Sequence, residues 1–480
     1  MSSNLRPFKD RRFFLCLTLY IEMKKLFSKI KKSKEASYSL ILTIALPLII
    51  TNSSQSLMQF TDRMFLAWHS PEALAACVPA GLLSFTIISF FMGSCGYTAV
   101  FVANYFGQKK YARLSVALWQ GVLLGVISWL AIILLTPLGR FFIMTTNHAP
   151  EIKAQELTYF TILALFGGFA VINNALASFF TGQGKTAITM AANIGGNIIN
   201  VALSYIMIFG KFGFPEMGIA GAGYSTVISG ACVMLFFLYL LFRPTINKKF
   251  RIGKLFGFNK KALWQLVRFG VPNGFGMFMD VISFTIFVLF VGNIDSISLA
   301  ASNIIMTLQT LEFLPLMGLT IAGQILMAQY RGARKTDVGV KALYNVFKLS
   351  LIYEAALFFC FFTFPETIFG AFIGGQTAQA HAIYSSAIVL LPFLFIFTLG
   401  DTVYLTFGDG LRGAGDTKFQ MKLMIICASF LMLGSYFIVE VFHGGLNALW
   451  AWMCIYGVGT GIFMMFRFFS GKWREIDITK

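Results

Sequence analysis

The chain has 480 residues, of which 57% are hydrophobic and only 12% are charged. Soluble domains carry about 25% charged residues, so this composition excludes an ordinary soluble enzyme or binding protein. The net charge of +18 would suggest a nucleic-acid partner in a soluble protein. Here Lys and Arg instead collect near the N-terminus and in alternate breaks between apolar runs, which argues against nucleic acid.

Apolar runs long enough to cross a bilayer follow one another along the chain. A helix needs about 20 apolar residues to span the hydrocarbon core. In lipid each backbone polar group must be bonded within the segment, so these runs predict helices. We therefore expect an all-α integral membrane protein of about twelve transmembrane helices, with no room for a soluble catalytic domain. The expected helices cover 39–68, 77–104, 115–138, 156–181, 186–210, 218–242, 265–292, 297–328, 342–364, 382–411, 419–442 and 446–468.

Residues 1–34 are predicted to form an N-terminal tail. Its apolar stretch at 13–21 is too short to span a bilayer. The lysine-rich segment that begins at Met23 is typical of the approach to a first membrane helix, which makes Met23 a candidate start of translation. No cleavable signal peptide is evident.

The distribution of Lys and Arg predicts the topology. Alternate loops are basic, while the loops between them carry little more than Lys153 and Lys211. By the positive-inside rule, both termini and the basic loops are expected in the cytoplasm, as for a multi-pass protein of the plasma (inner) membrane. The basic run at 248–261 is also expected to attract anionic lipid headgroups. The other basic loops hold Lys109, Lys110 and Arg113, and then Arg331, Arg334 and Lys335.

Sequence signals for cofactor chemistry are missing. The seven cysteines form no CxxC pair and the four histidines are scattered, so neither set predicts a disulfide framework or a metal site. HExxH, nucleophile–base, phosphate-loop and Rossmann patterns are also absent from the sequence. We therefore expect neither enzymatic activity nor direct use of ATP, and no cofactor.

A repeat at a constant offset joins the two halves of the chain. Pro47 and Pro272 are 225 residues apart, and each lies early in a long span. Further on, Gly184 and Gly415 are 231 residues apart, each in a turn between two spans. Such an ungapped run of matches indicates duplication. The other pairs at an offset of 225 are 74–76 with 299–301, Met92-Gly93 with Met317-Gly318, and Ala103, Tyr105, Gly107 and Lys110 with Ala328, Tyr330, Gly332 and Lys335.

The offset covers six helices, an even number, so equivalent helices cross the membrane in the same direction. The repeat therefore predicts two parallel six-helix bundles related by an axis along the membrane normal. We expect the bundles at 35–243 and 265–468, a basic cytoplasmic linker at 244–264, and a cytoplasmic tail at 469–480. Two such bundles around a midplane site are typical of alternating-access transporters.

Several segments resemble the multidrug and toxic compound extrusion (MATE) family, in its bacterial form. They are QSLMQFTDRMFLAWHSPEALAA at 55–76, ANYFGQKK at 103–110, NIINVALSYIMIFGKFGFPEMGIAGAG at 197–223 and LRGAGDTK at 411–418. The resemblance extends from about residue 35 to 470. It implies a monomeric secondary antiporter that exports cationic or amphipathic drugs in exchange for Na⁺ or H⁺.

The resemblance also implies roles for individual residues. The first-helix acid of the family falls on Asp62 and its companion amide on Gln55, while the fifth-helix amide falls on Asn200. In the second half the family's acids fall on Asp280 and Asp401. Some relatives carry a further acid four residues after the fifth-helix amide. This chain has Ser204 there, which weakens the case for a metal site in the first bundle.

Physical reasoning from the residues points to the same acids. An ionisable side chain at the bilayer centre costs about 2.5–3.5 kcal/mol, so each one calls for a partner or a function. Gln55, Gln59 and Asp62 have spacings of four and three, so they are predicted to share one helix face toward a cavity. The alternative for Asp62 is a local ion pair with Arg63.

In the second half, Asp280 and Asp401 lie well inside spans without a basic neighbour on the same helical turn. A buried carboxylate without a partner binds a proton or recruits a cation. We expect both, with Glu312, to line one coupling site, and Na⁺ is a candidate ligand of the two aspartates. Tyr404 joins Gln55, Gln59 and Asn200 among the residues expected to line the substrate cavity.

The remaining acids divide into several expectations. Asp409 and Arg412 are one turn apart and predict a structural ion pair. Glu354 fits either an interior carboxylate or an interface residue, and Glu440 is expected to be solvated. The sequence also leaves open a lipid-linked-precursor flippase of the same superfamily, although such proteins have additional helices and a cationic cavity. It does not decide between Na⁺ and H⁺.

Overall fold

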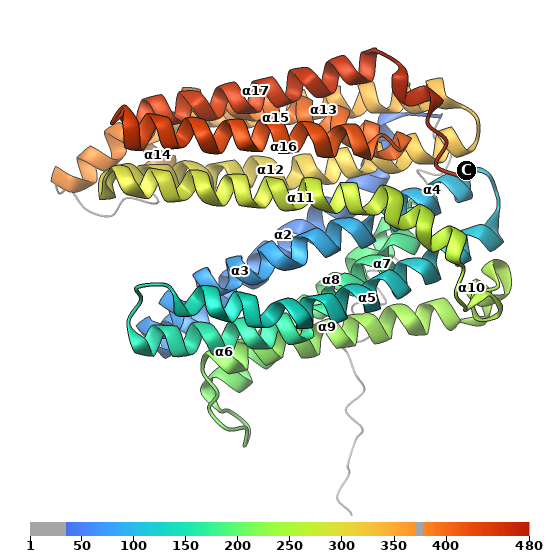
Figure 1. The fold of residues 1–480 in the computed structure, drawn as a ribbon, viewed down its shortest axis with the longest axis horizontal. Coiled ribbons are helices and arrows are strands. Elements are labelled where there is room, and N and C mark those ends of the chain that lie inside the picture. Colours follow the sequence, from blue (N-terminus) through green and yellow to red (C-terminus); the bar gives the residue numbers. More distant parts are fainter. Residues whose placement is uncertain (1–34, 371–377, 480) are drawn as a thin grey trace, which may run out of the picture.

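The computed structural model describes residues 35–370 and 378–479. The expectations for the tail at 1–34, including Met23, lie outside the described residues. Within the described part all regular structure is helical, and twelve helices are long and apolar enough to cross a membrane. The helices form two groups, coloured blue to green and yellow to red in Figure 1. The predicted all-α membrane fold with twelve spans is therefore confirmed.

The first bundle contains six spans, two of which are broken helices. The break between α3 and α4 falls at Tyr97. α7 packs beside it, and the side-chain amide of Asn174 from α7 donates to the backbone carbonyl of Met92 over 2.9 Å. Polar side chains of a neighbouring helix can thus satisfy backbone groups at a break within a membrane. The bounds are α2 Tyr38–His69, α3 Pro71–Gly96, α4 Thr98–Gly107, α5 Tyr111–Met144, α6 Pro150–Phe166, α7 Gly168–Thr181, α8 Thr186–Phe209 and α9 Ile219–Phe242.

The linker between the bundles is folded and docked on α5. It contains α10 (Pro244–Phe250) and a single turn of 3-10 helix, η1 (Gly253–Leu255). Ser115 donates to the carbonyl of Phe250 over 2.6 Å, and the indole of Trp119 donates to that of Ile252 over 3.0 Å. These contacts hold the linker against the first bundle.

The second bundle repeats the arrangement of the first. α11 begins at Lys260, five residues before the expected bundle boundary, because the side chain of Asn259 accepts from the Ala262 amide and caps the helix there. The bounds are α11 Lys260–Ile294, α12 Ser296–Gly332, α13 Thr336–Thr363, α14 Pro365–Gly370, α15 Ala378–Ala414, α16 Thr417–Tyr436, η2 Phe437–Val441, α17 Leu446–Phe469 and η3 Lys472–Glu475.

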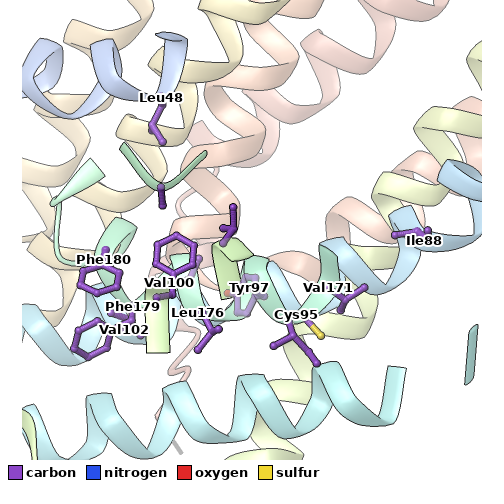
Figure 2. Close-up of a cluster of buried hydrophobic side chains, with 14 of the residues drawn as sticks. Leu48, Ile88, Cys95, Tyr97, Val100, Val102, Val171, Leu176, Phe179 and Phe180 are labelled. Carbon is purple, nitrogen blue, oxygen red and sulfur yellow. The ribbon is translucent and has the colours of Figure 1, made fainter. Parts of the chain in front are cut away.

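One large hydrophobic core belongs to the first bundle, and part of it is drawn in Figure 2. There Phe179 and Phe180 of α7 lie near Tyr97 and Val100 of the α3–α4 region. The same core includes residues of the second bundle from the starts of α11 and α13 and from the last part of α12. The rest of the second bundle has two cores of its own, so the bundles share apolar packing at one end.

That shared end carries the basic loops, and we call it the basic end. Here a Cβ atom added at Gly107 would lie 2.0 Å from the carbonyl oxygen of Gln329, and one added at Gly332 would lie 2.0 Å from that of Asn104. The two contacts exchange under the 225-residue offset, so this crossing of α4 and α12 obeys the internal symmetry. Only glycine permits so close a backbone approach.

A second symmetric pair of contacts lies nearer the middle of the helices. A Cβ atom at Gly93 would lie 2.7 Å from the Cα atom of Gly274, and one at Gly318 would lie 2.5 Å from the side chain of Ile49. In the described part of the chain, the hydrogen bonds and close glycine contacts that join the bundles lie between these positions and the basic end. Toward the other end the two groups of helices diverge (Figure 1).

Candidate functional site

Asp62 of α2 is buried inside the first bundle, where it is 6% exposed. It accepts a hydrogen bond from the hydroxyl of Ser204 of α8 over 2.7 Å, and Ser204 lies 2.6 Å from the hydroxyl of Ser225 of α9. Asp62 is thus held inside the bundle by three helices. No ion pair joins Asp62 to Arg63 in the described chain, so the local alternative allowed by the sequence is wrong.

The polar stripe expected on α2 is divided between two environments. Gln55 and Gln59 are exposed, whereas Asp62 turns into the bundle. Helical spacing alone placed the three on one face, but the hydroxyl of Ser204 draws the acid inward. Asn200 is fully buried, and its side-chain amide donates to the Thr226 hydroxyl over 3.2 Å. Its side-chain oxygen has no hydrogen-bond partner in the part of the chain that the structure describes.

In the second bundle a polar chain leads inward from Asp280 of α11. The hydroxyl of Tyr404 donates to Asp280 over 3.0 Å, and the guanidinium of Arg412 donates to the Tyr404 oxygen over 3.3 Å. Arg412 also pairs with Asp409 over 3.0 Å, so the predicted ion pair is confirmed. The backbone carbonyl of Arg412 accepts a hydrogen bond from the Tyr97 hydroxyl of the first bundle over 2.9 Å. The hydrogen bonds that begin at Asp280 therefore reach the contact between the two bundles.

Asp401 lies on α15 and is half-buried, as Asp280 is. The charge of Asp401 interacts with those of Asp280 and Glu354, so these acids of three helices lie within electrostatic range of one another. Asp401 makes no hydrogen bond within the described residues. The structure therefore brings together the two aspartates expected in the second bundle.

Glu312 of α12 is only 1% exposed, and among the described residues neither of its carboxyl oxygens has a hydrogen-bond partner. Three residues later Pro315 interrupts the hydrogen bonding of α12, because proline has no amide hydrogen to donate to Leu311 four residues before it. The hydroxyl of Tyr353 from α13 donates to that freed carbonyl over 2.7 Å. α12 and α13 are thereby joined beside Glu312.

Sequence reasoning left Glu354 of α13 without a role. It is 1% exposed, and its two carboxyl oxygens accept from Thr398 over 2.7 Å and from Thr402 over 2.8 Å. The sequence feature that could have indicated a partner for Glu354 is the pair of threonines on α15, Thr398 and Thr402, which lie four residues apart on either side of Asp401. Hydroxyls at that spacing share one helix face and can hold a single carboxylate between them.

The acids lie just beyond the contacts between the bundles. Asp280 follows Gly274 by six residues on α11, and Glu312 precedes Gly318 by six residues on α12, both away from the basic end. Six residues of helix rise about 9 Å. Groups of three or more His, Cys, Asp or Glu side chains arranged for a metal ion do not occur in the described residues. Oxygen ligands are nevertheless available on several helices.

Twelve membrane-length helices in two related bundles, each with a buried carboxylate, define a polytopic membrane transporter. The family profile MatE matches residues 47–206 and again residues 272–437, which together are more than half of the chain. The chain belongs to the MATE family, whose members are transporters and not enzymes. The two matched segments begin 225 residues apart, at the two prolines that revealed the repeat.

Curated relatives cover nearly the whole chain. A probable multidrug resistance protein NorM of Mesorhizobium japonicum is 26% identical over 454 residues, covering 91% of this chain and 93% of the relative. A NorM protein of Thermotoga maritima is also 26% identical, with the same coverage. The multidrug resistance protein PmpM of Pseudomonas aeruginosa is 26% identical and covers 80% of each chain.

Solved structures share the fold. A transporter of the MOP superfamily from Pyrococcus furiosus, described as having a binding pocket of reversed polarity, superposes with a TM-score of 0.82 at 20% identity, covering 94% of this chain and 98% of its own. An outward-facing multidrug resistance transporter of the MATE family superposes with a TM-score of 0.81 at 20% identity, covering 92% and 98%. At such identities the likeness shows the fold alone.

Proposed function

We propose that this protein is a secondary antiporter of the plasma (inner) membrane that exports cationic or amphipathic organic compounds in exchange for Na⁺ or H⁺. The proposal rests on the position of the acids. They lie in both bundles, farther from the basic end than the glycine contacts that join the bundles. A negative interior attracts cations, and oxygen ligands suit Na⁺. The multidrug resistance names of the NorM and PmpM relatives support the same class of substrate.

The orientation follows from the basic loops. If the basic end faces the cytoplasm, as the positive-inside rule requires, the bundles are joined on the inner side and diverge on the outer side. This is the geometry of an outward-facing state in an alternating-access cycle. The symmetric glycine contacts would then form the inner closure, which must part for substrate to enter from the cytoplasm.

Coupling is assigned to Asp280, Asp401 and Glu312 in the second bundle and to Asp62 in the first. Na⁺, if it is the coupling ion, would bind at Asp280 and Asp401. An ion drives transport only if it binds the inward- and outward-open states with different affinity. The chain from Asp280 through Tyr404 and Arg412 to the bundle contact supports such a difference, because it joins an acid to a contact that the cycle must break.

Substrate is proposed to contact Gln55, Gln59 and Tyr404, with Asn200 becoming accessible in another conformation. Aromatic rings make up 16% of the residues and Met contributes 21, so aromatic and thioether contacts with lipophilic cations are available. The acidic bundle interiors support this reading over a lipid-linked-precursor flippase, whose anionic substrate requires a cationic cavity. A monomer in lipid, without nucleic acid, is sufficient for the mechanism.

The test is export of a cationic dye from proteoliposomes under a Na⁺ gradient or a pH gradient, each imposed separately. Asp401→Asn is expected to abolish gradient-driven export while insertion is retained, because Asn keeps the volume but supplies neither charge nor a proton site. Asp62→Asn is expected to impair export as well. Glu440→Gln, at an exposed acid near the far end of the second bundle, is the matched control.

Wild-type export rates in both aspartate variants would show that the carboxylates are structural. Equal export with and without either gradient would refute the antiport mechanism itself. A response to only one gradient identifies the coupling ion.

A further inference from the structure

A groove opens on the surface of the first bundle where α9 ends and the linker begins, beside α10 at the basic end (Figure 1). Its volume is about 460 Å³. Because α9 is one of the twelve membrane-length helices, its last turns lie where a hydrocarbon core gives way to lipid headgroups. The residues that line the groove are Leu235, Leu238, Tyr239, Phe242, Arg243 and Pro244.

The groove is apolar along its length and cationic at one end. From Leu235 to Phe242 it follows seven residues of helix, which rise about 10 Å, a length that suits the upper part of an acyl chain. Arg243 comes directly after Phe242, is exposed, and forms no ion pair with any described residue. Long basic side chains at the end of a membrane helix reach the headgroup region. The groove therefore has the polarity of a phospholipid.

The linker surrounds the cationic end of the groove with positive charge that no nearby acid in the sequence offsets. Between Glu216 and Asp280 the chain has no Asp or Glu, while residues 243–261 contain seven Lys or Arg. None of these seven forms an ion pair within the part of the chain that the structure describes. Like charges repel one another, so an anion placed among them is attracted and lowers their mutual repulsion.

The contacts with α5 described above hold the linker in place, so its cations have fixed positions near the groove. The amide of Gly253 donates to the side chain of Asn247 over 3.0 Å, and a Cβ atom added at Gly253 would lie 3.8 Å from the ring of Phe242. The single turn η1 thus lies against the groove. Lys254 belongs to the same turn and is exposed, so a second cation is available at the end where Arg243 lies.

We propose that this groove binds one anionic phospholipid from the leaflet at the basic end. An acyl chain lies along Leu235 and Leu238, and the phosphate lies between Arg243 and Lys254. A free phosphate ion would use the two cations but leave the apolar groove empty, and a neutral lipid would fill the groove without offsetting the charge. The basic run of the linker by itself predicts only a diffuse attraction to anionic headgroups, whereas the groove adds a defined site.

The test is native mass spectrometry of the purified full-length protein, with phosphatidylglycerol and phosphatidylcholine of identical acyl chains added at equal concentration. The wild type is expected to retain a first phosphatidylglycerol in preference to phosphatidylcholine. Each cation near a membrane surface strengthens attraction to anionic lipid about fivefold. Arg243→Gln is therefore expected to weaken retention about fivefold, and the double variant with Lys254→Gln about 25-fold. Lys341→Gln removes an exposed cation of α13 near the basic end and, as the matched control, should leave retention unchanged.

The apolar part of the site is tested by filling it. Leu235 is exposed, so Leu235→Trp can occupy the groove without disturbing the interior of the bundle, and it is expected to weaken retention of phosphatidylglycerol about as much as Arg243→Gln. Leu134→Trp makes the same substitution at an exposed position of α5 outside the groove and should have no effect. Glycerol phosphate, which has the charge but no acyl chain, should not compete with the lipid.

Equal retention of the two lipids overturns the proposal, as does wild-type retention in either the double variant or Leu235→Trp. Competition by glycerol phosphate would show a phosphate site without an acyl groove and overturns the assignment to lipid. If a variant fails to fold, ionic strength takes its place. In about 1 M ammonium acetate charges are screened beyond about 3 Å, so the wild type must lose its preference for phosphatidylglycerol, and a preference that survives refutes the site.

Discussion

Replacing Gly332 by Ala should shift the conformational equilibrium by opening the contact at the basic end. The added Cβ atom would lie 2.0 Å from the backbone carbonyl oxygen of Asn104, and neither backbone segment can move without separating α12 from α4. A state in which the bundles part at this end is free of the clash. The substitution therefore raises the free energy of the described state relative to that alternative.

The magnitude follows from the closeness of the contact. Overpacking a well-packed interior typically costs about 1–3 kcal/mol, and a backbone obstacle places this site toward the upper part of that range. A difference of 1–3 kcal/mol changes a conformational equilibrium by about 5- to 150-fold. Gly107→Ala should act similarly, because the internal symmetry gives it the equivalent contact with Gln329.

The assay is double electron–electron resonance, which measures the distance between two spin labels. Spin labels at Glu72 of α3 and Glu366 of α14 lie on exposed positions at the diverging end, one in each bundle. The chain's seven cysteines must first be replaced. In Gly332→Ala a population with a shorter distance should grow, and dye export should slow because the inner closure no longer forms readily.

Gly459→Ala is the matched control, since no described residue outside its own helical turn lies within 4 Å of a Cβ atom added there in α17. It adds the same methyl group to a helix without the clash. If Gly332→Ala shows the same spin-label distance distribution as Gly459→Ala and the wild type, the glycine contact does not control the equilibrium between the two conformational states. The glycine contacts would then not act as an inner closure.

Two further substitutions test stability. Ser204→Ala removes the hydroxyl that donates to buried Asp62 and should lower the free energy of unfolding by about 1–3 kcal/mol, as measured by thermal unfolding in detergent. In an Asp62→Asn background this loss should be smaller, and an equal loss would show that the two residues do not interact energetically. Asp295→Ala removes the N-cap of α12 and should cost about 0.5–2 kcal/mol. The hydroxyl and amide of Ser298 hold the pKa of Asp295 below its ordinary value of 3.8. The stabilisation by ionised Asp295 is therefore fully present above pH 3.8 and is lost as the pH falls through the lowered pKa of the folded state. The difference in unfolding free energy between wild type and Asp295→Ala should vanish in acid, and a difference that does not change with pH would contradict this assignment.

The sequence by itself determined the features that depend on local composition and on spacing along one helix. Hydrophobic runs predicted twelve spans because a helix that crosses the lipid must be predominantly apolar over about 20 residues. The pairing of Asp409 with Arg412 followed from their separation by one turn. The duplication was also readable, since matches such as Pro47 with Pro272 need no structure to be counted.

Tertiary structure decided every feature that joins distant segments. Helical spacing placed Asp62 with Gln55 and Gln59, but a serine 142 residues further on draws it into the bundle. The role of Glu354 depends on threonines of α15, and no local pattern on α13 indicates them. Periodicity identifies which residues share a face of one helix, whereas only the packing of helices fixes what that face meets. For the same reason the closure of the bundles at the basic end, through glycines of both halves, was visible only in three dimensions.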